Sequence, residues 1–136
     1  MAIKNATPYL MIVGRADEAI AFYQSALGAS VESLQRFGDM DPNCPPALKN
    51  HVMHAVLNIG TAKIMMSDGS PDASAGTGGV VHVALDMDDV EQCKKAFDAL
   101  AVNGKAVQPL IDAPWGAMFG AVDDQFGVPW LFNCTK

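Results

Sequence analysis

The sequence predicts an α+β protein built from two successive copies of a βαβββ unit. In each half of the 136-residue chain, a strand-like stretch precedes an amphipathic helical pattern, and three strand-like stretches follow it. The halves also share letters, because AFYQSALGASV from Ala21 is similar to AFDALAVNGKAV from Ala96. One pattern that occurs twice in the same order indicates two modules of the same design.

The first half begins with a predicted strand and a predicted helix. Residues 7–13, TPYLMIV, are bulky and apolar after a proline, which a strand tolerates at its start. The helix is predicted over residues 15–30, with acids in its first turn and Gly28 where it would stop. Its apolar residues recur at helical spacing: Ala16, Ala19, Ile20, Tyr23 and Leu27.

Three strands and two breaks complete the first half. Residues 29–37 predict the first of these strands. Residues 38–50, GDMDPNCPPALKN, contain three prolines and no periodic pattern, so we expect an unusually long loop. Two strands then flank Gly60 and Thr61, which suit a tight hairpin turn. Residues 69–79, GSPDASAGTGG, are mostly small and predict a flexible linker.

The second half repeats this order. Residues 78–87 predict a strand, and residues 88–104 predict a helix that starts with acids and ends at Gly104. One apolar stripe on this helix is formed by Val90, Cys93, Phe97 and Leu100. The strands expected after it are residues 105–111, 117–122 and 128–134.

The length favours one domain rather than two independent ones. A chain of 136 residues, half of them apolar, can bury one core of ordinary size. We therefore predict a single domain over residues 1–136. Module one is expected over residues 1–68, the linker over 69–79 and module two over 80–136.

Composition excludes several classes of partner. The net charge of −6 and the scattered nine basic residues argue against nucleic acid or an anionic membrane surface. No apolar stretch is long enough to span a bilayer or to act as a secretory signal, so we expect a cytoplasmic protein. Cys44, Cys93 and Cys134 lie in unlike contexts without a C-x-x-C motif, which favours reduced thiols.

Several motifs together resemble a known superfamily. They are TPYL, AIAFYQSALGA, HAVLNIG followed by IMMSD, FDALAVNGK and, most specifically, DDQFGVPWLFN. The chain resembles the vicinal oxygen chelate superfamily, that is, the glyoxalase/bleomycin-resistance/dioxygenase fold, and more narrowly its PhnB-like branch. The resemblance implies two βαβββ modules that form a half-barrel with a concave ligand cavity and helices on the convex face. It also implies frequent assembly into homodimers.

The resemblance also implies four positions for a divalent metal. They fall at Pro8 (or Thr7, if the internal repeat sets the register), Met65, His82 and Leu131. Only His82 offers a good donor, because a thioether is a poor ligand for hard ions. Functional sites usually recruit at least three protein ligands. We therefore predict no metal and no cofactor at this site.

The hairpin around Gly60 and Thr61 sorts its residues onto two faces. With this turn, Ala55, Leu57 and Ile59 face Met66, Ile64 and Ala62, and this apolar side should meet the helix. The opposite side should line the cavity. It carries His54, Val56, Asn58, Lys63, Met65 and Ser67. A slip of one residue in the turn would move His54 to the helix side.

Three interpretations of His54 and His82 remain open. They are hydrogen-bonded histidines of a partly buried cavity, groups that contact a ligand or shuttle a proton, or parts of a non-standard metal site that includes Cys44. The stretch from His51 ends at Asp68, where several metalloenzymes would place a carboxylate ligand. We expect His51 itself at the surface.

Other side chains divide between core and pocket. Trp130 and Phe132 are expected in the core, whereas Trp115 suits either a pocket lid or the core. Asp123 and Asp124 should make a side-chain-to-backbone turn. Cys44 is expected as an exposed free thiol. The predicted ligand-binding set is His54, Met65, Ser67, His82, Trp115 and Leu131.

Two functional hypotheses follow. The first is a protein that binds a small organic molecule in an apolar cavity without the usual metal. The second is a lyase, isomerase or dioxygenase of the glyoxalase kind, dependent on a metal or assisted by His54 or His82 as a base. A nucleotide or S-adenosylmethionine fingerprint and a nucleophile elbow are missing from the sequence, so methyl transfer has no support. The sequence does not identify the ligand.

Overall fold

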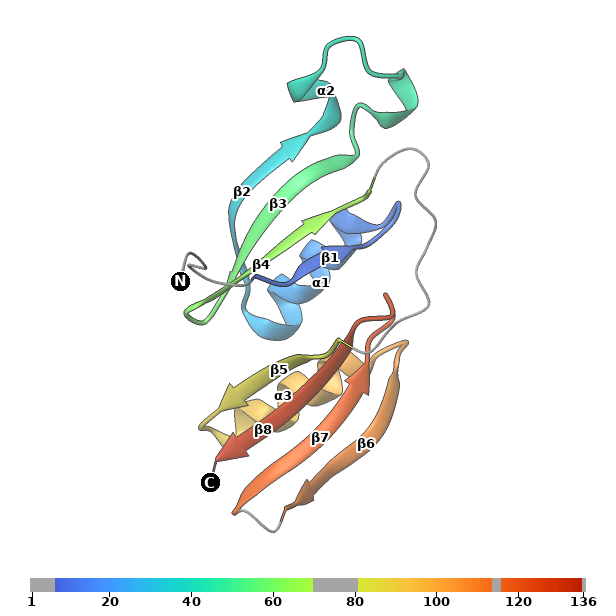
Figure 1. Cartoon of the computed structure of the whole chain (residues 1–136). Coiled ribbons are helices and arrows are strands. Elements are labelled where there is room, and N and C mark those ends of the chain that lie inside the picture. Colours follow the sequence, from blue (N-terminus) through green and yellow to red (C-terminus); the bar gives the residue numbers. More distant parts are fainter. Residues whose placement is uncertain (1–6, 70–80, 114–115, 136) are drawn as a thin grey trace. The chain divides into compact units, whose positions relative to one another are not determined.

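The computed structural model describes residues 7–69, 81–113 and 116–135. The chain divides into two compact units between residues 75 and 76, and each is described by itself. Each unit has one four-stranded sheet with a long helix against one face (Figure 1). Within the described ranges, no helix is long and apolar enough to cross a membrane.

The first unit forms a βαβββ module. Its sheet has the order β1-β4-β3-β2, with β1 parallel to β4 and the other pairs antiparallel. The main elements are β1 (Tyr9–Met11), α1 (Ala16–Leu27), β2 (Ser30–Arg36), β3 (Val52–Ile59) and β4 (Ala62–Ser67). The first strand is shorter than the seven residues expected from the sequence.

The second unit repeats the same topology. Its sheet has the order β5-β8-β7-β6, again with only the first pair parallel. Its elements are β5 (Val83–Met87), α3 (Val90–Ala101), β6 (Lys105–Asp112), β7 (Ala117–Asp123) and β8 (Pro129–Thr135). The predicted duplication of a βαβββ unit is confirmed, and neither sheet closes into a barrel.

The register of the β3–β4 hairpin agrees with the sequence prediction. Ile59 pairs with Ala62, Leu57 with Ile64 and Ala55 with Met66. Gly60 supplies the positive φ of 59° that the turn requires. Ala55, Leu57, Ile64 and Met66 are buried on the side of the sheet that α1 covers. His54 therefore lies on the helix-free side, as expected from strand alternation.

A buried carboxylate fixes the start of α1 to the sheet. Asp68 accepts hydrogen bonds from the backbone N–H of Ala16 at 2.9 Å and of Val52 at 2.7 Å. Each carboxylate oxygen thus satisfies a donor that burial would otherwise leave unpaired. The helix ends at Gly28, whose left-handed φ of 68° confirms the predicted stop. Asp68 has a structural task rather than the metal-binding one considered above.

In the second unit, α3 packs through its predicted stripe. Cys93, Phe97 and Leu100 are buried, and the Phe97 ring meets Phe132 edge-on at 5.3 Å between centroids. Burial and the neighbouring Cys134 thiol raise the pKa of Cys93 to about 12. Cys93 is therefore a protonated core residue, and Cys134 is buried beside it.

The predicted end of this helix was wrong. The helix ends at Ala101, and Gly104 has another reason to be glycine. A Cβ at Gly104 would lie 2.4 Å from the backbone oxygen of Asp123 and 3.0 Å from Cα of Asp124. Gly104 permits close approach of two backbone segments, a role that a one-dimensional pattern cannot distinguish from a helix stop.

The stretch predicted as a loop over residues 38–50 is partly helical. It contains α2 (Phe37–Met40) and the 3₁₀ turn η1 (Pro46–Leu48). At its base, Arg36 donates to both carboxylate oxygens of Asp17, which lowers the pKa of Asp17, and to the carbonyl of Asn50. Cys44, which lies between α2 and η1, is buried and not exposed as predicted.

A second buried carboxylate organises the turn before β8. Asp124 accepts from the backbone N–H of Phe126 and Val128, and from Nε1 of Trp130 at 2.8 Å. The predicted side-chain-to-backbone turn is therefore confirmed for Asp124. Trp130 and Phe132 are fully buried, which confirms their assignment to the core. Trp115 and most of the predicted linker lie outside the described residues.

Candidate functional site

The helix-free face of the first sheet is the candidate site. Its central part, here called the module-one face, consists of alternate residues from three adjacent strands. Tyr9 pairs with Met65, and Met65 pairs with Val56, so the three side chains cross the sheet on one side. The module-one face consists of Tyr9 and Met11 from β1, Met65 and Ser67 from β4, and His54 and Val56 from β3.

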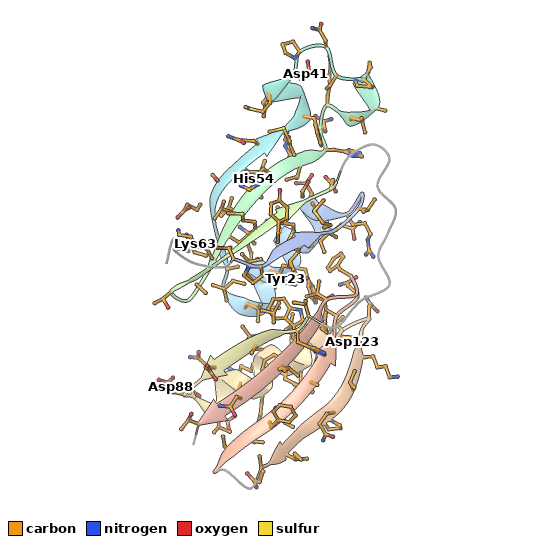
Figure 2. All side chains as sticks on the ribbon, in the orientation of Figure 1. Tyr23, Asp41, His54, Lys63, Asp88 and Asp123 are labelled. Atoms are coloured by element: carbon orange, nitrogen blue, oxygen red, sulfur yellow. The ribbon has the colours of Figure 1, made fainter. Side chains whose placement is uncertain are left out.

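Tyr9 and His54 form a hydrogen-bonded pair across this face. Tyr9 Oη lies 3.0 Å from His54 Nδ1, and the two ring centroids are 5.6 Å apart with an interplanar angle of 47°. His54 is labelled on β3 in Figure 2. β1 and β3 are not neighbours in the sheet, because β4 lies between them. The pair therefore bridges the central strand and places two polar groups together on a surface that is otherwise mainly apolar.

Two other members of this face differ in exposure. Met11 is 53% exposed and Tyr9 is 44% exposed, unusually high fractions for large side chains with apolar surface. Ser67, by contrast, is buried, and its Oγ lies 2.9 Å from the N–H of Gly69 and 3.4 Å from the carbonyl of Val52. Its hydroxyl therefore helps to close the end of β4.

The hairpin end of the same side of the sheet carries an ion pair. The Lys63 ammonium contacts Glu32 and also donates to Asn58 Oδ1 at 3.2 Å. The Lys63 side chain holds the pKa of Glu32 below its usual range. Both ionic side chains are about half exposed, so this pair contributes little to stability. The positive charge of Lys63 is therefore already paired with the Glu32 carboxylate.

The predicted residues of module two are arranged differently. Leu131 pairs with Ala84 and Ala121 on the helix-free side of the second sheet. His82 was predicted inside a strand, but β5 begins at Val83 and the His82 side chain is exposed. Trp115 is among the residues that the structure does not describe. Of the predicted ligand-binding set, the structure thus brings together His54, Met65 and Ser67 within one module.

Tyr9 is the site residue that sequence reasoning missed. It lies in the TPYL motif, but nothing local assigns its face, because β1 joins the sheet only through the distant strand β4. The register of Tyr9 opposite Met65 places it beside the histidine. Met65 was the signal that could have identified Tyr9. The face of Met65 was predicted correctly, and β1 pairs in parallel with β4, the strand that carries Met65.

Comparison with known proteins establishes the family. The model of the glyoxalase/bleomycin resistance protein/dioxygenase superfamily matches residues 6–132. The chain belongs to this superfamily. YjdN of Escherichia coli is 39% identical to it over 140 residues, which cover 96% of this chain and 95% of YjdN.

Solved structures of this superfamily agree with the fold. PA1353 of Pseudomonas aeruginosa is 33% identical and superposes with a TM-score of 0.86, covering 98% of both chains. The PhnB protein of Bacillus cereus has a TM-score of 0.80 at 24% identity, covering 97% of this chain and all of that one. The likeness to PhnB concerns the fold. The superfamily expected from the sequence is confirmed, and PhnB-like proteins are among its structural neighbours.

The residues at the expected metal positions do not suit a divalent ion. Pro8, Met65 and Leu131 offer no carboxylate or imidazole, and His82 alone would be a single ligand. Within residues 7–69, 81–113 and 116–135, no group of three or more His, Cys, Asp or Glu side chains could hold a metal. Asp68 is not a substitute, because both of its oxygens accept backbone N–H groups.

Proposed function

We propose that this protein binds a small organic molecule against the helix-free sheet surfaces and does so without the superfamily's usual metal set. The observation that carries the proposal is the module-one face, where the exposed Met11 and the half-buried Met65 lie beside a single polar pair. Ligand sites commonly combine mostly apolar walls with a few placed polar groups. Tyr9 and Met11 supply the exposed surface, and the Tyr9–His54 pair supplies the polar groups.

Adaptable side chains support this proposal. Met11 and Met65 have flexible, polarisable thioethers that can fit ligands of irregular shape. Exposed apolar groups that gather on one side of a sheet mark binding surfaces more often than isolated ones do. In this proposal, Ser67 supports the end of β4, and Met65 provides the wall beneath the ligand.

The proposal extends to the second module and to the assembly. We also propose Leu131, His82 and Trp115, the predicted residues of the second module, as ligand contacts of that module. A single functional domain over residues 1–136, a homodimer and a cytoplasmic location complete the proposal. They rest on the sequence pattern and on the family.

A reaction assisted by histidine is a second candidate function. The hydrogen bond between Tyr9 and His54 favours it, because an imidazole held by a phenol can accept or donate a proton at its other nitrogen. Turnover of a bound compound, lost in a His54→Ala variant that still binds it, would identify this function.

The proposed site can be mapped through methionine methyl groups. We expect compounds from a fragment library that bind the protein to shift the ¹³C-methyl NMR signals of Met11 and Met65. The adjacent Met66 should shift much less, because it points to the buried helix side. Two neighbouring residues on opposite faces thus provide a matched probe and control within one strand.

Assignment would use single Met→Leu variants, which preserve volume approximately. Binding that shifts Met66 or the distant Met40 while leaving Met11 and Met65 unchanged would contradict the proposed location. A complete absence of binders in a broad library would contradict the proposed function itself.

A further inference from the structure

The Tyr9–His54 pair is not a requirement of the βαβββ fold, because the second copy of the unit folds without it. Met65 pairs with Tyr9 and Val56, and at the same place Leu131 pairs with Ala84 and Ala121. Tyr9 therefore corresponds to Ala84. His54 lies two residues before Val56, and Phe119 lies two residues before Ala121. His54 therefore corresponds to Phe119. The same architecture forms with an alanine and a phenylalanine at these positions, so the polar pair has a separate purpose.

The hydrogen bond determines what the pair can offer to a ligand. If the Tyr9 hydroxyl donates to Nδ1, the imidazole proton is on Nε2, which is then a donor outside the mutual bond. If Nδ1 carries the proton and donates to the phenol oxygen, the hydroxyl hydrogen is the free donor. If the imidazole is protonated, both donors are available. In each state the pair presents at least one N–H or O–H beyond their mutual bond.

The surroundings of the pair favour a negatively charged acceptor over a cation. The adjacent members of the module-one face are Met11, Met65, Ser67 and Val56, and Gln35 of β2 pairs with His54. None of these carries a carboxylate that could neutralise a cationic ligand. The nearest acid on these strands, Glu32, is held by Lys63. A cation buried against this surface would meet only the uncharged lone pairs of the pair and no carboxylate.

We infer that the ligand is a mostly apolar carboxylate whose oxygen accepts a hydrogen bond from the Tyr9–His54 pair. The inference rests on the proposed function and specifies its ligand class. The exposed Tyr9 ring and the Met11 and Met65 side chains contact the apolar body. Hydrogen bonds to an ionised acceptor are about twice as strong as neutral ones, so the charged end determines selectivity.

Three probes of similar shape test this inference: phenylacetate, phenylacetamide and 2-phenylethylammonium. Their dissociation constants would be measured from the Met65 methyl signal, and the imidazole ¹⁵N signals of His54 would report its tautomer. We expect phenylacetate to bind at least roughly tenfold more tightly than the ammonium compound, the value of one hydrogen bond to a charged group. Phenylacetamide should lie between them.

Two variants separate the polar pair from the apolar surface. Tyr9→Phe keeps the ring and removes the hydroxyl, and it should weaken phenylacetate binding roughly tenfold while changing 2-phenylethylammonium about twofold or less. His54→Phe introduces the residue found at the equivalent position of module two and should have a similar effect. His51→Gln, which removes an imidazole at the base of β3 outside the module-one face, is the matched control and should change neither.

The outcomes distinguish this inference from the proposed function. Equal binding of all three probes at Met65, or unchanged phenylacetate binding in Tyr9→Phe, would overturn the carboxylate assignment and leave the site in place. No shift of Met11 or Met65 with any probe would overturn the inference. The same result, together with a fragment screen that finds no binder, would also overturn the proposed function.

Discussion

Replacement of Asp124 by alanine is expected to lower the free energy of unfolding by about 3 kcal/mol or more. Asp124 is buried and accepts hydrogen bonds from Phe126 N, Val128 N and Trp130 Nε1. The Trp130 side chain is fully buried, so its N–H would be left without this acceptor. An unsatisfied buried donor costs about 1–3 kcal/mol, and the variant removes the acceptor of the buried bonds from Val128 N and Trp130 Nε1.

Urea unfolding followed by tryptophan fluorescence would measure this effect. Both tryptophans of the chain, Trp115 and Trp130, belong to the second module, so the signal reports the module that carries the substitution. Asp123→Ala is the matched control, because Asp123 is the exposed neighbour and should change stability by about 0.5 kcal/mol or less. Equal losses for the two variants would contradict the assigned role of Asp124.

The second large effect is expected at Gly104. A Gly104→Ala variant should lose roughly 2–3 kcal/mol, because the new methyl group must displace backbone rather than a flexible side chain. The Cβ would lie 2.4 Å from the Asp123 carbonyl oxygen and 3.0 Å from the Asp124 backbone. That backbone is itself held by the Asp124 turn, so it cannot move without loss of those hydrogen bonds.

Gly60→Ala provides the comparison for this prediction. Gly60 has a φ of 59°, and a Cβ added there would meet no atom within 4 Å, so only backbone strain opposes the change. We expect a loss of about 1 kcal/mol for that variant. Thermal and urea unfolding of both variants would measure the difference. A smaller loss at Gly104 than at Gly60 would show that the backbone contact is not tightly constrained.

The fold could be predicted because its determinants are local. Alternation in β3 and β4, with Gly60 at the turn, gave the correct register and the correct face for His54. Helical spacing gave the buried stripes of α1 and α3. Strand and helix periods act over a few residues, so one sequence is enough to reveal them.

The features that were missed depend on contacts between distant segments. Gly104 resembles a helix stop until the backbone of Asp123 is placed against it. Cys44 resembles an exposed loop residue until the turns around it are formed. Tyr9 becomes a site residue only when β1 pairs with β4, a contact between the two ends of module one. Contacts between distant segments produce no periodic pattern of residues in the sequence.

The roles of the buried carboxylates Asp68 and Asp124 could be predicted only in part. Asp124 was correctly expected to cap a turn, because Asp before QFGVP is a local signal. Its bond to Trp130 was not predictable, since it depends on the return of β8 beneath the turn. Asp68 raised the question of a metal ligand, and the answer came only from its two long-range backbone donors, Ala16 and Val52.

This protein, in our proposal, binds its ligand without a metal. The most direct test is calorimetric titration of phenylacetate, or the tightest compound from the fragment screen, into chelator-treated protein and into protein with added Zn²⁺, Ni²⁺, Mn²⁺ or Fe²⁺. We predict dissociation constants that agree within about twofold under all conditions. Binding that requires one of these ions, and that is lost together with ion binding in a His82→Ala variant, would contradict the claim.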